Sequence, residues 1–229
     1  MSEIITVKND FLAEKYDKVV ASSGLTVYVF PKQLTTTYAA ISVPFGSLDS
    51  TFRFADEEEM LTLPDGIAHF LEHKMFESED HVDTFDKFAA VGASANAYTS
   101  NELTSYLFTT HDDVEPPLRI LLDYVFKPYF TTKNVEKEVG IVGQEIKMYE
   151  DSSGSRLYHS MMELLYQVHG IRTKIAGSLS SISAITPELL MRCHRAWRQS
   201  LHERPWAPAR RSRTAWCSSR DPASANEGR

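Results

Sequence analysis

Residues 65–76 read DGIAHFLEHKMF, and this stretch decides how the rest of the chain is interpreted. Asp65 and Gly66 are typical of a break in regular structure, and the residues that follow favour a helix. Within that helix His69 and His73 are four residues apart, so 3.6 residues per turn place both on one face with Cβ atoms ~6 Å apart. Two imidazoles in this arrangement can bind one tetrahedral metal ion.

Glu72 stands directly before His73 and three residues after His69. From that position it can reach a metal-bound water instead of the metal. Neutral imidazole ligands leave zinc with positive charge, which lowers the pKa of its water from ~15.7 towards ~7. A nearby carboxylate then removes the proton and returns it to a leaving amine. The pattern predicts a zinc metallopeptidase with Glu72 as the base; the alternative is a helix whose histidines only pack or cap.

A third protein ligand is needed if one position on the zinc is to stay open for water. A helical pattern over residues 133–149 offers Glu138 and Glu145, which are seven residues and therefore two turns apart on one face. Either carboxylate could face the histidine helix. Glu136 and Glu150 lie off that face and are expected to be solvated surface charges.

The remaining pattern predicts strands that alternate with helices. Residues 24–31 and 38–46 alternate in polarity and are rich in β-branched residues, so we expect a β-hairpin or adjacent strands there. Tyr149 and the Tyr and Met side chains of a helix at 156–169 are expected to fill the core. The order predicts an α+β fold, a largely antiparallel sheet with helices packed on one side. Further strands are expected at 94–99 and 104–110, and further helices at 67–76, 82–91, 116–127 and 187–197.

Composition limits the classes of function. The 229-residue chain is 42% hydrophobic and 24% charged, as is ordinary for a globular protein with a core. Its net charge of -7 argues against nucleic acid as a partner, because phosphate binding draws on clustered Lys and Arg. Two cysteines make no disulfide framework and favour a reducing compartment. Because no signal peptide or apolar run of the ~20 residues that span a membrane is visible, we expect a cytoplasmic protein with no membrane partner.

Residues 197–229 differ from the rest in composition. They hold all three tryptophans and seven arginines, but no Lys, Ile, Val, Phe, Tyr or Met. Such a segment offers too little apolar surface to order itself, so we expect a disordered Arg/Ser/Pro/Ala-rich tail after a zinc-binding domain at 1–196. The abrupt change leads to the hypothesis of out-of-frame translation or a truncated gene product. Translating the DNA past codon 197 in its other two frames tests it, since finding no apolar strand would remove the idea.

Three motifs in order carry a resemblance to a known family. They are the histidine stretch at 65–76, GASANAYTSNELTSYLF at 92–108 and EKEVGIVGQEIKMYED at 136–151. Together they resemble the inverzincin metallopeptidases of the pitrilysin, insulysin and mitochondrial-processing-peptidase family, in the style of its bacterial processing-protease-like members. The likeness runs from about residue 24 to about residue 196. It implies a fold of the LuxS/pitrilysin-peptidase type.

The resemblance also implies roles for particular residues. His69, His73 and Glu145 are implied to hold one zinc ion, with Glu72 as the catalytic base. Glu138 is implied to be an outer carboxylate that orients a ligand histidine.

Three further residues match the strand that runs beside the zinc in this family, and the match implies that they bind substrate. Such a strand edge pairs with an extended substrate through backbone hydrogen bonds, while alternate side chains give selectivity. For the asparagine, the alternative is an ordinary residue at the end of a strand. The three residues are Asn96, Ala97 and Thr99.

Substrate and partners follow from the same resemblance. It implies a peptide or unfolded polypeptide as substrate, and a second homologous half or subunit that completes the catalytic chamber. The chain has no match to that half, nor to the last strand and Gly-Asp ending expected after the helix at 187–197, so the domain is expected to be truncated. The leading hypothesis is a zinc endopeptidase or its metal-bearing fragment. The alternatives are a non-catalytic partner subunit and a fragment with no function.

Overall fold

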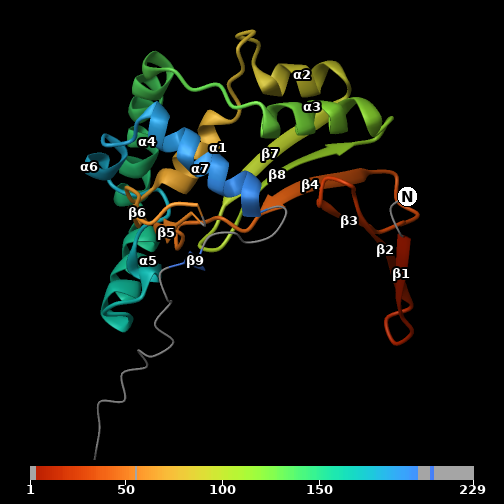
Figure 1. Ribbon diagram of the computed structural model, residues 1–229, viewed down its shortest axis with the longest axis horizontal. Coiled ribbons are helices and arrows are strands. Elements are labelled where there is room, and N and C mark those ends of the chain that lie inside the picture. The colour runs from red at the N-terminus through yellow and green to blue at the C-terminus, as the bar shows by residue number, and fades with distance from the viewer. Residues whose placement is uncertain (1–3, 55, 201–206, 209–229) are drawn as a thin grey trace, which may run out of the picture.

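The computed structural model describes residues 4–54, 56–200 and 207–208 (Figure 1). The described strands are β1 (Ile4–Asn9), β2 (Glu14–Val20), β3 (Thr26–Val29), β4 (Thr37–Val43), β5 (Thr51–Arg53), β6 (Leu61–Thr62), β7 (Ala93–Thr99), β8 (Thr104–Thr110) and β9 (Ala207–Pro208). The described helices are α1 (Ile67–Lys74), α2 (Thr84–Ala90), α3 (Glu115–Phe126), α4 (Thr132–Asp151), α5 (Ser153–Leu165), the 3₁₀ helix η1 (Gly170–Arg172), α6 (Leu179–Ile182) and α7 (Pro187–Ser200).

The sheet that positions the site has the strand order β4-β8-β7. Both neighbours of β8 run antiparallel to it in full seven-residue register, from Thr37↔Thr110 to Val43↔Thr104 and from Ala93↔Thr110 to Thr99↔Thr104. Helices α2 and α3 lie over β7 and β8, and α1 also packs against both strands (Figure 1). The predicted α+β class, with antiparallel strands and helices packed against them, is confirmed.

The expected hairpin of residues 24–31 and 38–46 is wrong. Strand β3 pairs with β2, from Asp17↔Val29 to Val20↔Thr26, whereas β4 pairs with β8 in a different sheet. The cause lies in residues 4–20, for which the pattern predicts no element. They form β1 and β2, and Gly24 closes the tight β2–β3 turn with a φ of 90°, a conformation that only glycine adopts without strain. Strand β3, which was expected to pair with β4, therefore pairs with β2, the strand before it in the sequence.

The expected helices are present, but α5 ends at Leu165 instead of continuing to residue 169. The prediction that its Tyr and Met side chains fill the core is wrong. None of the described residues of α5 is buried, and Tyr158 and Met161 are 47% and 44% exposed. Tyr149 is also 40% exposed. Periodicity alone shows that a helix has an apolar face, but it does not show what covers that face.

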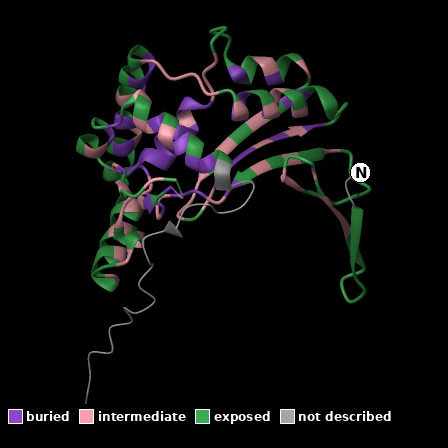
Figure 2. Ribbon diagram, in the orientation of Figure 1, coloured by how far each residue is buried: buried purple, intermediate pink, exposed green. Residues whose placement is uncertain are grey.

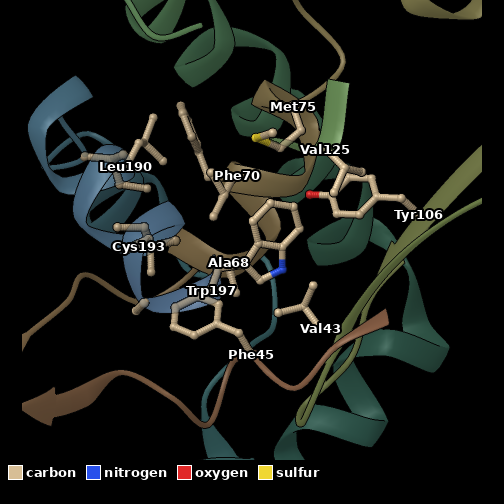
Figure 3. Close-up of a cluster of buried hydrophobic side chains, with 14 of the residues drawn as sticks. Val43, Phe45, Ala68, Phe70, Met75, Tyr106, Val125, Leu190, Cys193 and Trp197 are labelled. Atoms are coloured by element: carbon tan, nitrogen blue, oxygen red, sulfur yellow. The ribbon is translucent and has the colours of Figure 1, made fainter. Parts of the chain in front are cut away.

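The core gathers around α1, where the helix meets α7 and the central sheet (Figure 2). Figure 3 shows Phe70 of α1 and Met75, the residue that follows this helix, packed with Tyr106 of β8 and with Trp197 of α7. The indole of Trp197 lies 5.7 Å from the ring of Tyr106, centroid to centroid, and is fully buried. Seven of the eight residues of α1 are buried, so the polar side chains on this helix must find partners inside the protein.

The boundary expected between residues 196 and 197 falls inside α7. That helix continues to Ser200, and Trp197 on it is fully buried, so residue 197 is part of the folded domain. The large buried ring of Trp197 ties this end of α7 to the core. Of the remaining predicted tail, Ala207–Pro208 forms β9 and pairs with β5. Residues 201–206 and 209–229, on which the prediction of disorder falls, lie outside the described residues.

His194 makes the stability of this core depend on pH. It lies on α7, is 3% exposed and donates from Nε2 to the carbonyl oxygen of Val125. Burial lowers its pKa to about 4, from the usual histidine value of 6.5. The unfolded chain therefore binds a proton between pH 6.5 and 4 that the folded chain does not, so stability falls as pH falls through this window, by at most about 1.4 kcal/mol per pH unit.

A His194→Gln variant tests this dependence, since an amide can still donate to Val125 but does not titrate. Urea unfolding of both proteins should show the free energy of unfolding falling more steeply for the unsubstituted chain between pH 6.5 and 4.5. Above pH 7 the difference between the two proteins should stay constant. Parallel curves over the whole range would show that His194 is not the titrating group.

Candidate metal centre

Helix α1 carries the three residues of the histidine motif. It starts after Gly66, whose φ of 90° favours glycine, and a Cβ at Gly66 would lie 2.5 Å from the carbonyl oxygen of Ala176. This close backbone approach fixes the start of the helix against the segment before α6. His69 and Glu72 are each 9% exposed, and the rings of His69 and His73 are 4.6 Å apart, centroid to centroid. The expected common face of the two imidazoles is therefore present.

Helix α4 brings the carboxylates. Its first turn is held by a reciprocal capping box between Thr131 and Asn134, and the helix packs against α1. Glu138 and Glu145, two turns apart, both face α1, whereas Glu136 and Glu150 are exposed as predicted. Spacing alone allowed either carboxylate to face the histidine helix. In the structure both face it, and each contacts the histidines at a different place.

Glu145 stands between the two imidazoles. Its Oε1 lies 3.6 Å from His69 Nε2, and its Oε2 lies 3.4 Å from His73 Nε2. One ligand atom from each of the three residues falls within 4.8 Å of the others. Tetrahedral zinc with ligands at ~2.0–2.1 Å holds its donors roughly 3.3–3.4 Å apart, so this donor set fits zinc in both chemistry and spacing.

Glu138 holds one of the histidines instead of joining the cluster. Its Oε1 lies 3.1 Å from His73 Nδ1, and because an ionised carboxylate only accepts, Nδ1 carries the hydrogen. In that tautomer His73 Nε2 carries no hydrogen, and this nitrogen is the one that lies 3.4 Å from Glu145 Oε2. Burial raises the pKa of Glu138, but the hydrogen bond with His73 and the charge of Lys74 outweigh it, so the pKa is lower than usual. Glu138 thus contacts the His73 ring at Nδ1, while Glu145 lies near Nε2 of the same ring.

Two hydroxyl groups orient the acidic residues. Thr99 Oγ1 donates to Glu72 Oε2 at 2.6 Å, and Tyr149 Oη donates to Glu145 Oε1 at 2.7 Å. The imidazole of His69 is the main cause that lowers the pKa of Glu145 to about 2, with burial opposing it and the Tyr149 hydrogen bond adding to it. The same hydrogen bond is the main cause that raises the pKa of Tyr149 to about 12. Both carboxylates are thereby held in fixed directions at neutral pH.

A cavity of about 410 Å³ opens beside the cluster. Ala97 and Thr99 line it together with His69, His73 and Glu145. A larger cavity of about 560 Å³ lies between α2 and α3 and includes none of the predicted site residues.

Asn96 does not line the cavity beside the cluster. Along β7, Ala93 is buried and Ala95, Ala97 and Thr99 are partly buried, while Ser94, Asn96 and Tyr98 are exposed. Of the three exposed residues only Tyr98, nearer the end of the strand, lines the cavity. The Asn96 carboxamide oxygen accepts from the backbone N–H of Ala97 at 2.8 Å.

The edge of β7 beside α1 is open among the described residues, because β7 pairs with β8 alone. An open edge offers backbone N–H and C=O groups to an extended peptide. The cavity next to it also contains residues that the sequence pattern did not single out as site residues: Tyr149, Tyr158, His159 and Lys174. Only Tyr149 carries a signal, since it follows Glu145 by four residues and so by about one helical turn.

The family model described as insulinase, peptidase family M16, matches residues 35–178. The chain belongs to this family. The predicted membership is therefore confirmed, and all three sequence motifs fall within the matched region.

M16 relatives include two proteins of Bacillus subtilis (strain 168). The one named uncharacterized zinc protease YmfH is 51% identical over 174 residues, which cover 76% of this chain and 40% of that protein. The putative zinc protease AlbF is 27% identical over 188 residues, which cover 81% of this chain and 43% of that protein. The chain thus spans about two fifths of these relatives.

Solved structures of the M16 family share the fold. A putative M16-like peptidase from Alicyclobacillus acidocaldarius matches with a TM-score of 0.76 and 37% identity, covering 88% of this chain and 44% of that one. Pitrilysin matches with a TM-score of 0.70 and 22% identity over 87% of this chain and 22% of its own, which shows a common fold. Among the residues that the structure describes, no helix combines the length and the apolar composition that a membrane span needs.

Proposed function

We propose that this M16 chain binds one zinc ion through His69, His73 and Glu145 and is the metal-bearing part of a zinc endopeptidase. The observation that carries the proposal is the convergence of these three donors, with Glu145 3.4–3.6 Å from both imidazoles. Glu72 stands beside them but is not one of the clustered donors. Three protein ligands leave one position for water or substrate, as a catalytic zinc site requires.

Zinc, when bound, supplies a Lewis acid that polarises a carbonyl and makes water acidic at neutral pH. Glu72 takes the proton from the attacking water and delivers it to the leaving amine. Thr99 holds Glu72 in place for both transfers through the hydrogen bond at 2.6 Å. Glu138 holds the ring of His73, so its Nε2 keeps facing Glu145.

The open edge of β7 is the proposed binding site for an extended peptide or unfolded polypeptide. Ala97 and Thr99 would present their backbone groups beside the cavity, and Asn96 would act from the outer face of the strand. We also propose that a second homologous half or subunit completes the catalytic chamber. The proposed location of the protein is the cytoplasm. The out-of-frame origin of the last residues stays a hypothesis.

A non-catalytic partner subunit is the competing function. A solved M16 inactive domain from Pseudomonas fluorescens shares the fold at a TM-score of 0.63 and 18% identity, so the fold alone does not separate the two functions. The complete donor set, together with Glu72 and its Thr99 contact, favours the enzyme.

Zinc content and chelation test the proposal. The dialysed chain is expected to retain about one zinc ion, and to hydrolyse a quenched fluorescent peptide alone or with a homologous half from a relative. 1,10-Phenanthroline should remove both properties, and zinc, but not magnesium, should restore them because the donor set is nitrogen-rich. A folded chain that binds no zinc would overturn the proposal. Stoichiometric zinc without hydrolysis under either condition would favour the non-catalytic subunit.

A further inference from the structure

Lys74 is a buried cation that the proposed chemistry does not use. It follows His73 directly on α1, and its side chain is 0% exposed. A charge in the interior is costly unless it is paired, and lysine is among the residues least often buried completely. The position of this lysine next to a metal ligand therefore calls for a physical reason.

The partners of Lys74 connect it to the zinc site. Its Nζ lies 2.9 Å from Glu77 Oε2 and 3.6 Å from Glu138 Oε2. The other oxygen of Glu138 lies 3.1 Å from His73 Nδ1. At the outer end, Lys137 Nζ lies 3.7 Å from Glu77 Oε1. An unbroken chain of contacts thus runs from the surface through Lys74 to a histidine of the metal cluster.

Glu138 is the residue through which Lys74 would act. Its side chain is only 7% exposed, and its two oxygens have separate tasks, one towards Lys74 and one towards His73. A glutamate has three rotatable bonds, so a contact at one oxygen leaves the direction of the other poorly fixed. A cation 3.6 Å from Oε2 restricts that freedom, and carboxylates that hydrogen-bond a ligand histidine, as Glu138 does, orient the ligands of zinc sites.

We propose that Lys74 is a positioning residue for the zinc site: it fixes the Glu138 carboxylate, and through it the direction of the His73 ring. The proposal rests on the zinc site of the proposed function. It differs from a purely structural role, in which the buried ion pairs only contribute to folding. The two roles make different predictions for zinc affinity when Lys74 and Glu138 are changed together.

A double-mutant cycle on the full 229-residue chain measures this difference. The dissociation constant of Zn²⁺ is determined by competition with a chromophoric chelator for the unsubstituted chain, Lys74→Met, Glu138→Gln and the double variant. Methionine keeps the unbranched apolar stem of lysine and fills its space. Lys137→Met is the matched control, because it removes an exposed lysine of the same network that does not contact Glu138. Circular dichroism and the urea midpoint report folding in each case.

Lys74→Met is expected to weaken Zn²⁺ binding about 10–100-fold, the range for residues that support a metal ligand. Glu138→Gln should weaken it to a similar extent, and the double variant should be no weaker than Glu138→Gln alone. Lys137→Met should leave affinity unchanged within about twofold, as expected for a surface charge. The double variant removes both buried charges, so its urea midpoint should recover relative to Lys74→Met while its zinc affinity stays low.

Two results would overturn the inference. One is a folded Lys74→Met chain whose Zn²⁺ affinity equals that of the unsubstituted protein, and the other is a pair of losses that multiply in the double variant. If Lys74→Met does not fold, Lys74→Gln takes its place, because its amide ends one atom short of the lysine nitrogen, and the same criteria apply. Failure of the unsubstituted, folded chain to bind Zn²⁺ would instead overturn the proposed function and this inference together.

Discussion

Replacing Glu72 with glutamine is expected to lower peptide hydrolysis by about 10²–10⁴-fold, the usual contribution of a positioned general acid–base group. The amide has the shape of the carboxylate, and its oxygen can still accept the hydrogen bond that Thr99 donates at 2.6 Å. It has no basic site for the proton of the attacking water. Zinc content should not change, since the three clustered donors exclude Glu72.

The measurement is initial-rate hydrolysis of a fluorescent peptide together with metal analysis of the same preparations. Glu136→Gln is the matched control, because Glu136 is an exposed glutamate on α4 that faces away from the cluster. It should retain both zinc and activity. Undiminished hydrolysis by a zinc-loaded Glu72→Gln protein would show that another group is the base.

Replacing Glu145 with alanine is expected to weaken Zn²⁺ binding by more than about 100-fold, the upper end of the range for residues that only support a ligand. Glu145 is the donor that stands near both imidazoles, 3.6 Å from His69 Nε2 and 3.4 Å from His73 Nε2. Its removal leaves two neutral nitrogen donors and takes away the one negative charge of the set. Two donors are fewer than any zinc site of the usual kind supplies.

Competition with a chromophoric chelator measures the loss, and circular dichroism reports whether the fold is retained. Side-chain exposure of 23% places Glu145 at the wall of the cavity, so its truncation should not unfold the protein. Glu136→Ala on the same helix should bind Zn²⁺ like the unsubstituted chain. Retention of tight zinc binding by a folded Glu145→Ala protein would mean that the third ligand lies elsewhere.

Much of the site follows from helical geometry within single segments. The spacing of His69 and His73 fixes their common face wherever the helix lies, and the seven residues between Glu138 and Glu145 do the same for α4. The separate places of these two carboxylates came from the resemblance, because spacing alone allows either one to face the histidines. In the structure Glu145 stands between both rings and Glu138 supports one of them.

Strand pairing and burial were predicted less well, because both depend on segments that are distant in sequence. The alternating polarity of residues 24–31 and 38–46 indicates strands but does not name their neighbours. Here β2 takes β3 and β8 takes β4. The apolar residues of α5 likewise predict a buried face, yet none of its described residues is buried.

The sequence by itself determined the family, the α+β class and the residues that the zinc proposal uses, because these depend on local periodicity and on motifs that stay together in the chain. Only the tertiary structure decided that Thr99 holds Glu72, that Lys74 is buried against Glu138 and that Trp197 belongs to the core. Each of these contacts joins residues from different elements. The packing of α1 against β7, α4 and α7 brings them together, and no single segment encodes that packing.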